Sequence, residues 1–249
     1  MGTERLLLVA LIGFVGQIID GALGMAYGVT CSTALISLGI APAVASASVH
    51  TAEIFTTAAS GYSHWRLGNV DMRLMARLAV PGMIGGILGA YALTSFPADQ
   101  VVPVVSLYLL LLGVTIIFRA YWRPLVTREP TTPRLVGLGL AGGFLDAAGG
   151  GGWGPIVTSS LIGSGAAPRT AIGSVNLAEF FVAATVTATF VATIGLELWP
   201  IIIGLIAGGV LAAPLAALVA SRVPARPLML LVGTLVILVS ARNILKFFG

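Results

Sequence analysis

The chain has 249 residues, of which 57% are hydrophobic and 9% charged, and its mean hydropathy is +1.03. Soluble domains carry about 25% charged residues, so this composition excludes an ordinary soluble protein and indicates an integral membrane protein. The net charge of +4 comes from basic residues in short segments between apolar runs, without a nucleic-acid-binding motif, and the single Cys31 excludes an internal disulfide.

Five apolar elements follow one another in the first half of the chain. They are 6–19, 29–40, 43–60, 74–95 and 101–118, and their counterparts begin at Leu135. At 1.5 Å rise per residue the first two elements are about 21 and 18 Å long, shorter than the roughly 30 Å hydrocarbon core of a bilayer. We therefore expect an all-α polytopic membrane protein of about ten apolar elements. The first two of each half are predicted to be half-helices or a re-entrant hairpin, broken at a glycine-rich motif.

The second half of the sequence repeats the first. Residues 20–59 match residues 146–185 without a gap, with about 15 of the 40 positions identical. Polar positions recur in the same register, because Asp20 matches Asp146 and Glu53 matches Glu179. We predict one transmembrane domain over 1–249 that arose by duplication, with repeats at about 5–122 and 132–247.

Loop charge predicts how the two repeats are oriented. Segment 64–77 is basic, whereas its counterpart 195–199 carries only Glu197. The next connection reverses this pattern, with Asp99 in the first half and Arg222 and Arg226 in the second. Matched loops therefore face opposite sides of the membrane, as inverted repeats require. With the basic loops in the cytoplasm, both termini are extracytoplasmic and the protein is a multi-pass protein of the cytoplasmic membrane.

Four acidic residues fall at membrane depth. Burying an ionised carboxylate there costs at least about 2.5 kcal/mol, so each should be paired, protonated or facing water. The apolar segments offer no arginine or lysine at the same depth. These residues are candidates for proton coupling: Asp20, Glu53, Asp146 and Glu179.

A polar stripe runs along one face of the third element. His50 and Glu53 are three residues apart, and Ser46 and Thr57 extend the same face. One interpretation is a structural clamp between helices, and the other is a functional stripe with a titratable histidine. The matching residues in the second half are Asn176 and Glu179.

The glycine-rich breaks at 20–28 and 146–155 point to the binding site. Glycine lets backbone approach a ligand closely, and a half-helix that starts after such a break presents free amides to an anion. Tyr27 and Trp153 occupy matching positions and either gate the cavity or fill space. Other glycines, such as Gly85 and Gly208, are expected only to permit close helix packing. The predicted substrate-binding residues are Gly24, Tyr27, Gly28, Ser48, His50, Gly150, Gly151, Trp153, Gly154, Ser174 and Asn176.

These motifs resemble those of the TauE/SafE sulfite exporter family. The resemblance rests on DGALGMAYG at 20–28, the run from 50 to 71 and GGGGWGP at 149–155, and it extends over nearly the whole chain. It implies an inner-membrane permease that exports sulfite or small organosulfonates, with one glycine-rich motif from each half. Because Asn176 replaces His50 in the second half, a role of the histidine carries over to one half only.

The sequence leaves other functions open. A proton- or cation-coupled carrier would use the four carboxylates directly, whereas anion binding needs amides, hydroxyls and a protonated His50 in place of arginine or lysine. No nucleophile and base pair, cofactor motif or metal-ligand set is evident, which disfavours an enzyme. We therefore expect no cofactor and no bound metal, with a small anionic substrate and the lipid bilayer as the partners.

Overall fold

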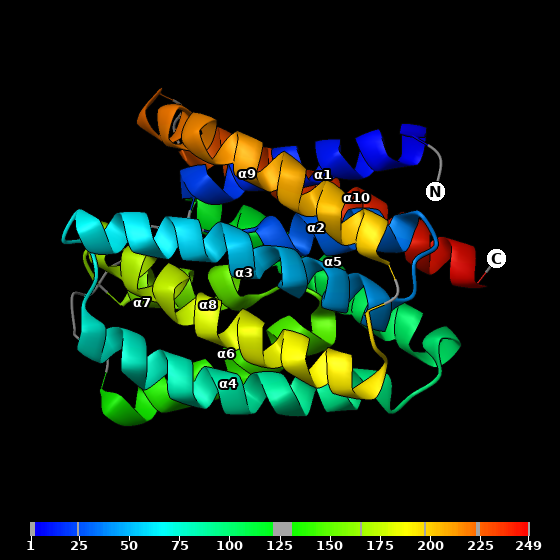
Figure 1. Cartoon of the computed structure of the whole chain (residues 1–249), viewed down its shortest axis with the longest axis horizontal. Helices are drawn as coiled ribbons and strands as arrows, with labels where there is room; N and C mark the ends of the chain where they lie inside the picture. Colours follow the sequence, from blue (N-terminus) through cyan, green and yellow to red (C-terminus); the bar gives the residue numbers. More distant parts are fainter. Residues whose placement is uncertain are drawn as a thin grey trace.

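A computed structural model describes residues 3–23, 25–121, 131–164, 166–196, 198–222 and 225–248 (Figure 1). These ranges contain helices and no β-strand, so the predicted all-α fold class is confirmed. The elements are α1 (Thr3–Leu23), α2 (Tyr27–Ser37), α3 (Pro42–Arg66), α4 (Met72–Thr94), α5 (Ala98–Tyr121), α6 (Thr132–Gly149), the π-helix η1 (Gly154–Thr158), α7 (Ser159–Gly163), α8 (Pro168–Thr193), α9 (Trp199–Arg222) and α10 (Ala225–Phe248).

Within the described residues, four helices are long and apolar enough to cross a membrane. The spans are 72–94, 98–121, 169–193 and 229–247, in α4, α5, α8 and α10. Large apolar side chains such as Leu107 and Leu238 lie exposed on the outer faces of these helices. An apolar exterior of this kind is suited to lipid contact, so the chain is a polytopic membrane protein.

The first element of each half is longer than the sequence predicts. α1 has 21 residues and α6 has 18, so Asp20 and Asp146 lie in the last turns of helices and not in the breaks. Glycine weakens a helix without ending it. α1 ends at Leu23 and α6 at Gly149, and positive φ angles follow at Ala26 (97°) and at Gly150 (71°). The second elements are short as predicted, since α2 has 11 residues and η1 and α7 have five each.

The helices pair in a reciprocal pattern. α1 packs along α9 and α6 along α4, while α5 packs against α10 and α3 against α8. The α1–α9 and α6–α4 pairs each join the first element of one half to the fourth element of the other half. The α5–α10 and α3–α8 pairs join matching elements. Two repeats related by a two-fold axis give this pattern. The repeat limits themselves stay a prediction.

The ends of the helices fall into two groups. Figure 1 shows the start of α1, the end of α10 and the start of α9 at one end of the bundle, with the α3–α4 turn (cyan) and the end of α9 (orange) at the other. This grouping is the one that the loop charges predict, although the side that faces the cytoplasm stays a prediction. Of the charged residues named for that prediction, Glu197 lies outside the described residues.

Glycines allow the two reciprocal pairs to pack closely. A methyl group on Gly85 of α4 would overlap the carbonyl oxygen of Leu140 in α6, and one on Gly208 of α9 would overlap that of Ala10 in α1. The prediction that these glycines permit helix packing is confirmed.

Candidate functional site

The two glycine-rich breaks meet in the interior. A Cβ atom on Gly28 would lie 2.9 Å from the Cα of Gly151 and 3.0 Å from Glu53 Oε1. Backbone from both halves therefore crosses at van der Waals distance, beside a buried carboxylate. We call this contact between Gly28 and Gly151 the glycine crossing. Gly154 begins η1 next to it, whereas Gly24 lies outside the described residues.

An aspartate caps the segment that follows each break. Asp20 Oδ1 accepts a hydrogen bond from the Tyr27 amide at 3.3 Å, and Asp146 Oδ1 accepts one from the Trp153 amide at 3.0 Å. In each half the carboxylate comes from seven residues earlier in the chain. The expectation that these amides are free for an anion is therefore wrong for these two groups, because a carboxylate already occupies them.

His50 joins the two halves. Its ring is fully buried, with Nε2 3.1 Å from Asp146 Oδ2 and Nδ1 2.8 Å from the carbonyl oxygen of Ser46. The carbonyl needs a proton on Nδ1, and the contact with Asp146 needs one on Nε2 or on the carboxyl group. His50 and Asp146 therefore share a proton, as an ion pair or as a neutral pair.

Glu53 completes a compact cluster. Its Oε2 atom is 4.0 Å from His50 Nε2 and has no hydrogen-bond partner among the described residues, although the side chain is 2% exposed. Ligand atoms of His50, Glu53 and Asp146 all lie within 4.8 Å of one another, a spacing that can hold a metal ion. Sequence reasoning did not find this set, because Asp146 is 96 residues away from His50.

The other two carboxylates extend the acidic region. Asp20 and Glu179 are half-buried, and Glu179 interacts electrostatically with Glu53, Asp20 and Asp146. Among the described residues, no arginine or lysine forms an ion pair with any of the four.

Comparison with known proteins gives the family. Residues 9–243 match the family described as Sulfite exporter TauE/SafE. The chain belongs to this family. It is also 44% identical over 251 residues to a protein of Bacillus subtilis (strain 168) named "Probable membrane transporter protein YtnM", with 98% of this chain and 84% of that protein covered. No solved structure matches. The TauE/SafE chain is therefore a membrane transporter.

Hydroxyl groups hold the second break of this TauE/SafE transporter in place. Three hydroxyl groups donate to backbone carbonyls at the second break: Ser46 to Ala147 at 2.8 Å, Tyr108 to Gly151 at 2.9 Å, and Ser32 to Gly150. Sequence reasoning missed Ser32 and Tyr108. The isolated tyrosine within the apolar run 101–118 was the available signal.

Tyr27 and Trp153 have matching roles in the TauE/SafE repeats. Both side chains are buried, at 3% and 0% exposure. Tyr27 donates from its hydroxyl to the Leu205 carbonyl at 3.3 Å, and Trp153 donates from Nε1 to the Val175 carbonyl at 3.2 Å. An aromatic body in the core with its polar tip bonded to a neighbouring helix favours the space-filling interpretation over a gate.

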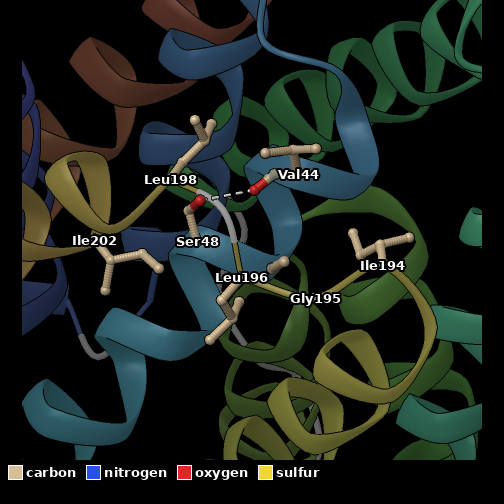
Figure 2. Close-up of a pocket in the computed structure, with 8 residues that line it drawn as sticks. Val44, Ser48, Ile194, Gly195, Leu196, Leu198 and Ile202 are labelled. Atoms are coloured by element: carbon tan, nitrogen blue, oxygen red, sulfur yellow. Dashed lines mark hydrogen bonds between the residues drawn. The ribbon is translucent and has the colours of Figure 1, made fainter. Parts of the chain in front are cut away.

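Three predicted contacts lie apart from the glycine crossing. Ser48 donates to the Val44 carbonyl at 2.8 Å and lines a small cavity together with Ile194, Gly195, Leu196 and Leu198 (Figure 2). Ser174 accepts from the Asp71 amide at 2.9 Å, and Asn176 donates to Ser60 Oγ at 2.8 Å. Ser48 comes two residues before His50, and Ser174 comes two residues before Asn176. Two residues turn a helix by about 200°, so each serine lies on a different face of its helix from the residue that follows it.

Proposed function

We propose that this transporter exports a small sulfur-containing anion, sulfite or an organosulfonate, across the cytoplasmic membrane, with both termini extracytoplasmic. The family description supports the substrate class. The glycine crossing supports the location of the site, because backbone of both halves meets there at membrane depth. A potential of about 100 mV, negative inside, drives each negative charge outward by about 2.3 kcal/mol.

Transport proceeds by alternating access around the crossing. In the described residues the amides of Tyr27 and Trp153 are occupied by aspartates, and His50 is held between Asp146 and the Ser46 carbonyl. An anion gains these donors only when a carboxylate is protonated or moves away, since two anions cannot share one amide. Substrate binding is thus linked to the charge of the aspartates.

Flux from proteoliposomes tests the proposal. Purified protein is reconstituted and loaded in turn with sulfite, thiosulfate, a taurine-like sulfonate, chloride and acetate. We expect efflux of at least one sulfur anion well above that of chloride, increased by an inside-negative potential. Protein-free vesicles give the background. A folded protein that moves no sulfur anion faster than chloride would refute the substrate class.

The second candidate is a proton- or cation-coupled carrier. The unpartnered Oε2 atom of Glu53 beside His50 and Asp146 favours it, because a proton or a cation would satisfy that oxygen. The same vesicles discriminate the two functions. Flux of sodium or a divalent metal that needs no sulfur anion would select the cation carrier, and sulfur-anion flux that depends on a pH gradient would select proton coupling.

A further inference from the structure

Buried polar groups without partners gather on three helices. Of the eight such side-chain atoms found among the described residues, five lie on α2, α5 and α10. All five side chains are more than nine-tenths buried. They are Thr30 Oγ1, Thr33 Oγ1, Ser106 Oγ, Ser240 Oγ and Asn243 Nδ2.

Helical hydroxyls elsewhere in the molecule behave differently. Ser48, Thr51 and Thr115 each donate to the carbonyl one turn earlier, at 2.7 to 2.8 Å. This local bond is open to any serine or threonine in a helix. A buried hydroxyl left without a bond costs about 1–3 kcal/mol, so four hydroxyls and an amide on adjoining helices indicate a polar occupant.

The five groups lie on helices that are neighbours in the bundle. α2, α5 and α10 contact one another in pairs (Figure 1). A Cβ atom on Gly113 of α5 would lie 3.0 Å from the carbonyl oxygen of Gly233 in α10, which fixes the level at which these antiparallel helices cross. Ser106 and Ser240 are each seven residues from that crossing, in the same direction along the bundle, and so lie at about the same level. We call these groups the polar stripe of α2, α5 and α10.

Two cavities lie beside the α2 and α10 residues of the stripe, toward the end of the bundle that carries the termini. One, of about 250 Å³, lies between α1, α2 and α10. Thr30, Thr33 and Ser37 of α2 line it on one side, and the rest of its lining is apolar: Leu11, Ile12, Val15, Ala34, Leu235, Val236 and Val239. A second, of about 340 Å³, includes Ser37 and Asn243 together with the charged side chains of Asp99 and Lys246. At the other end, Thr30 is two residues from the glycine crossing.

We propose that the polar stripe of α2, α5 and α10 is a hydrated half-pathway between the glycine crossing and the end of the molecule that carries the termini. Its hydroxyl and amide groups take a small hydrophilic anion with its water. This inference rests on the proposed function for the identity of the solute, but not for the existence of the path.

The second half lacks the matching stripe. The counterpart of Thr30 is Ile156, and the counterpart of Thr33 is Ser159, whose hydroxyl donates to the Pro155 carbonyl. Neither threonine of α2 therefore has a matching unpartnered hydroxyl after the second break, an inequality expected of a conformation with one open side.

Cysteine accessibility tests the path without any transport measurement. Cys31 is the only cysteine, so Cys31→Ala provides a cysteine-free background. Ser106→Cys and Ser240→Cys place thiols on the stripe, and Leu107→Cys and Leu238→Cys place matched thiols on the exposed apolar faces of the same helices. The probe is a membrane-impermeant sulfonatoethyl methanethiosulfonate. The thiolate attacks its sulfenyl sulfur, a mixed disulfide forms and methanesulfinate leaves.

We expect the two stripe thiols to react about tenfold or more faster than the two controls, because thiolate forms in water and not in lipid. Equal rates would overturn the pathway, even if sulfite efflux is normal. Fast labelling in a protein that moves no sulfur anion supports the pathway and refutes only the proposed substrate. Should Ser106→Cys fail to fold, as judged by size exclusion, Asn243→Cys at the second cavity takes its place.

Discussion

Replacing Gly151 by alanine tests the contact between the two breaks. Gly151 has a φ of 150°, which L residues rarely adopt. A methyl group there would overlap the amide nitrogen of Val29 and the carbonyl carbon of Gly28, and it would lie 2.9 Å from the Val29 Cα. These neighbours are backbone atoms, so rotation of a side chain cannot relieve the overlap.

The cost has two parts. Overpacking in an interior costs about 1–3 kcal/mol, and a sparsely populated backbone conformation adds about 1–3 kcal/mol. We therefore expect Gly151→Ala to lower the free energy of unfolding by about 2–6 kcal/mol. Gly28→Ala should carry only the overpacking part, because its Cβ would lie 2.9 Å from the Gly151 Cα and 3.0 Å from Glu53 Oε1 without a positive φ.

Thermal unfolding in detergent and sulfite efflux from vesicles are measured on the same preparations. Gly137→Ala is the matched control, since Gly137 lies within α6, is exposed and has no atom within 4 Å of an added Cβ. Alanine is favoured there by about 1 kcal/mol through helix propensity. We expect the unfolding midpoint to be highest for Gly137→Ala, lower for Gly28→Ala and lowest for Gly151→Ala. The Gly151→Ala protein should not transport.

A Gly151→Ala protein that unfolds at the wild-type temperature and transports normally would refute the reasoning. It would mean that the breaks do not touch in the working transporter. Loss of transport with an unchanged unfolding midpoint would place the glycine in the path of the solute, and would show that the calculated strain is absorbed elsewhere.

Three further predictions concern charge and topology. Glu53→Gln keeps the side-chain shape and removes the charge, so efflux should lose its dependence on pH between about pH 5 and 8 if this residue carries a proton; an unchanged profile would assign it a structural role. His50→Asn leaves Asp146 Oδ2 without its donor and should cost about 1–3 kcal/mol in thermal unfolding, whereas equal stability would contradict the shared proton. In the Cys31→Ala background, a cysteine at Asp99 should react with an impermeant reagent from outside the cell, and one at Asn69 should not. The opposite result would show that the termini face the cytoplasm.

Duplication made part of the site predictable. Matching motifs at one offset implied a two-fold relation, and elements related in that way can meet only near the axis. The sequence thus indicated that the breaks would come together in the interior. It could not indicate that Gly28 would face Gly151, because Gly28 matches Gly154 in the alignment of the repeats.

The capping aspartates could not be located from the sequence. The glycine-rich segments that follow Asp20 and Asp146 predict that each helix ends at the aspartate, because glycine disfavours the helical state. In the structure each helix continues past the aspartate, and the first break contains a non-glycine residue, Ala26, at positive φ. Only the folded backbone shows that the amide seven residues later returns to the carboxylate.

The difference between His50 and Asn176 gives the two halves unequal charge. The Asp146 carboxylate has His50 beside it, so the pair carries no net charge wherever its shared proton lies. Asp20 in the first half accepts from a backbone amide, which supplies no proton that can move, and Asn176 donates to Ser60 on α3. An anion at the glycine crossing is therefore repelled less by Asp146 than by an ionised Asp20. Asp20 is also less buried than Asp146, so the two matching aspartates differ in their exposure to solvent as well as in the histidine beside one of them.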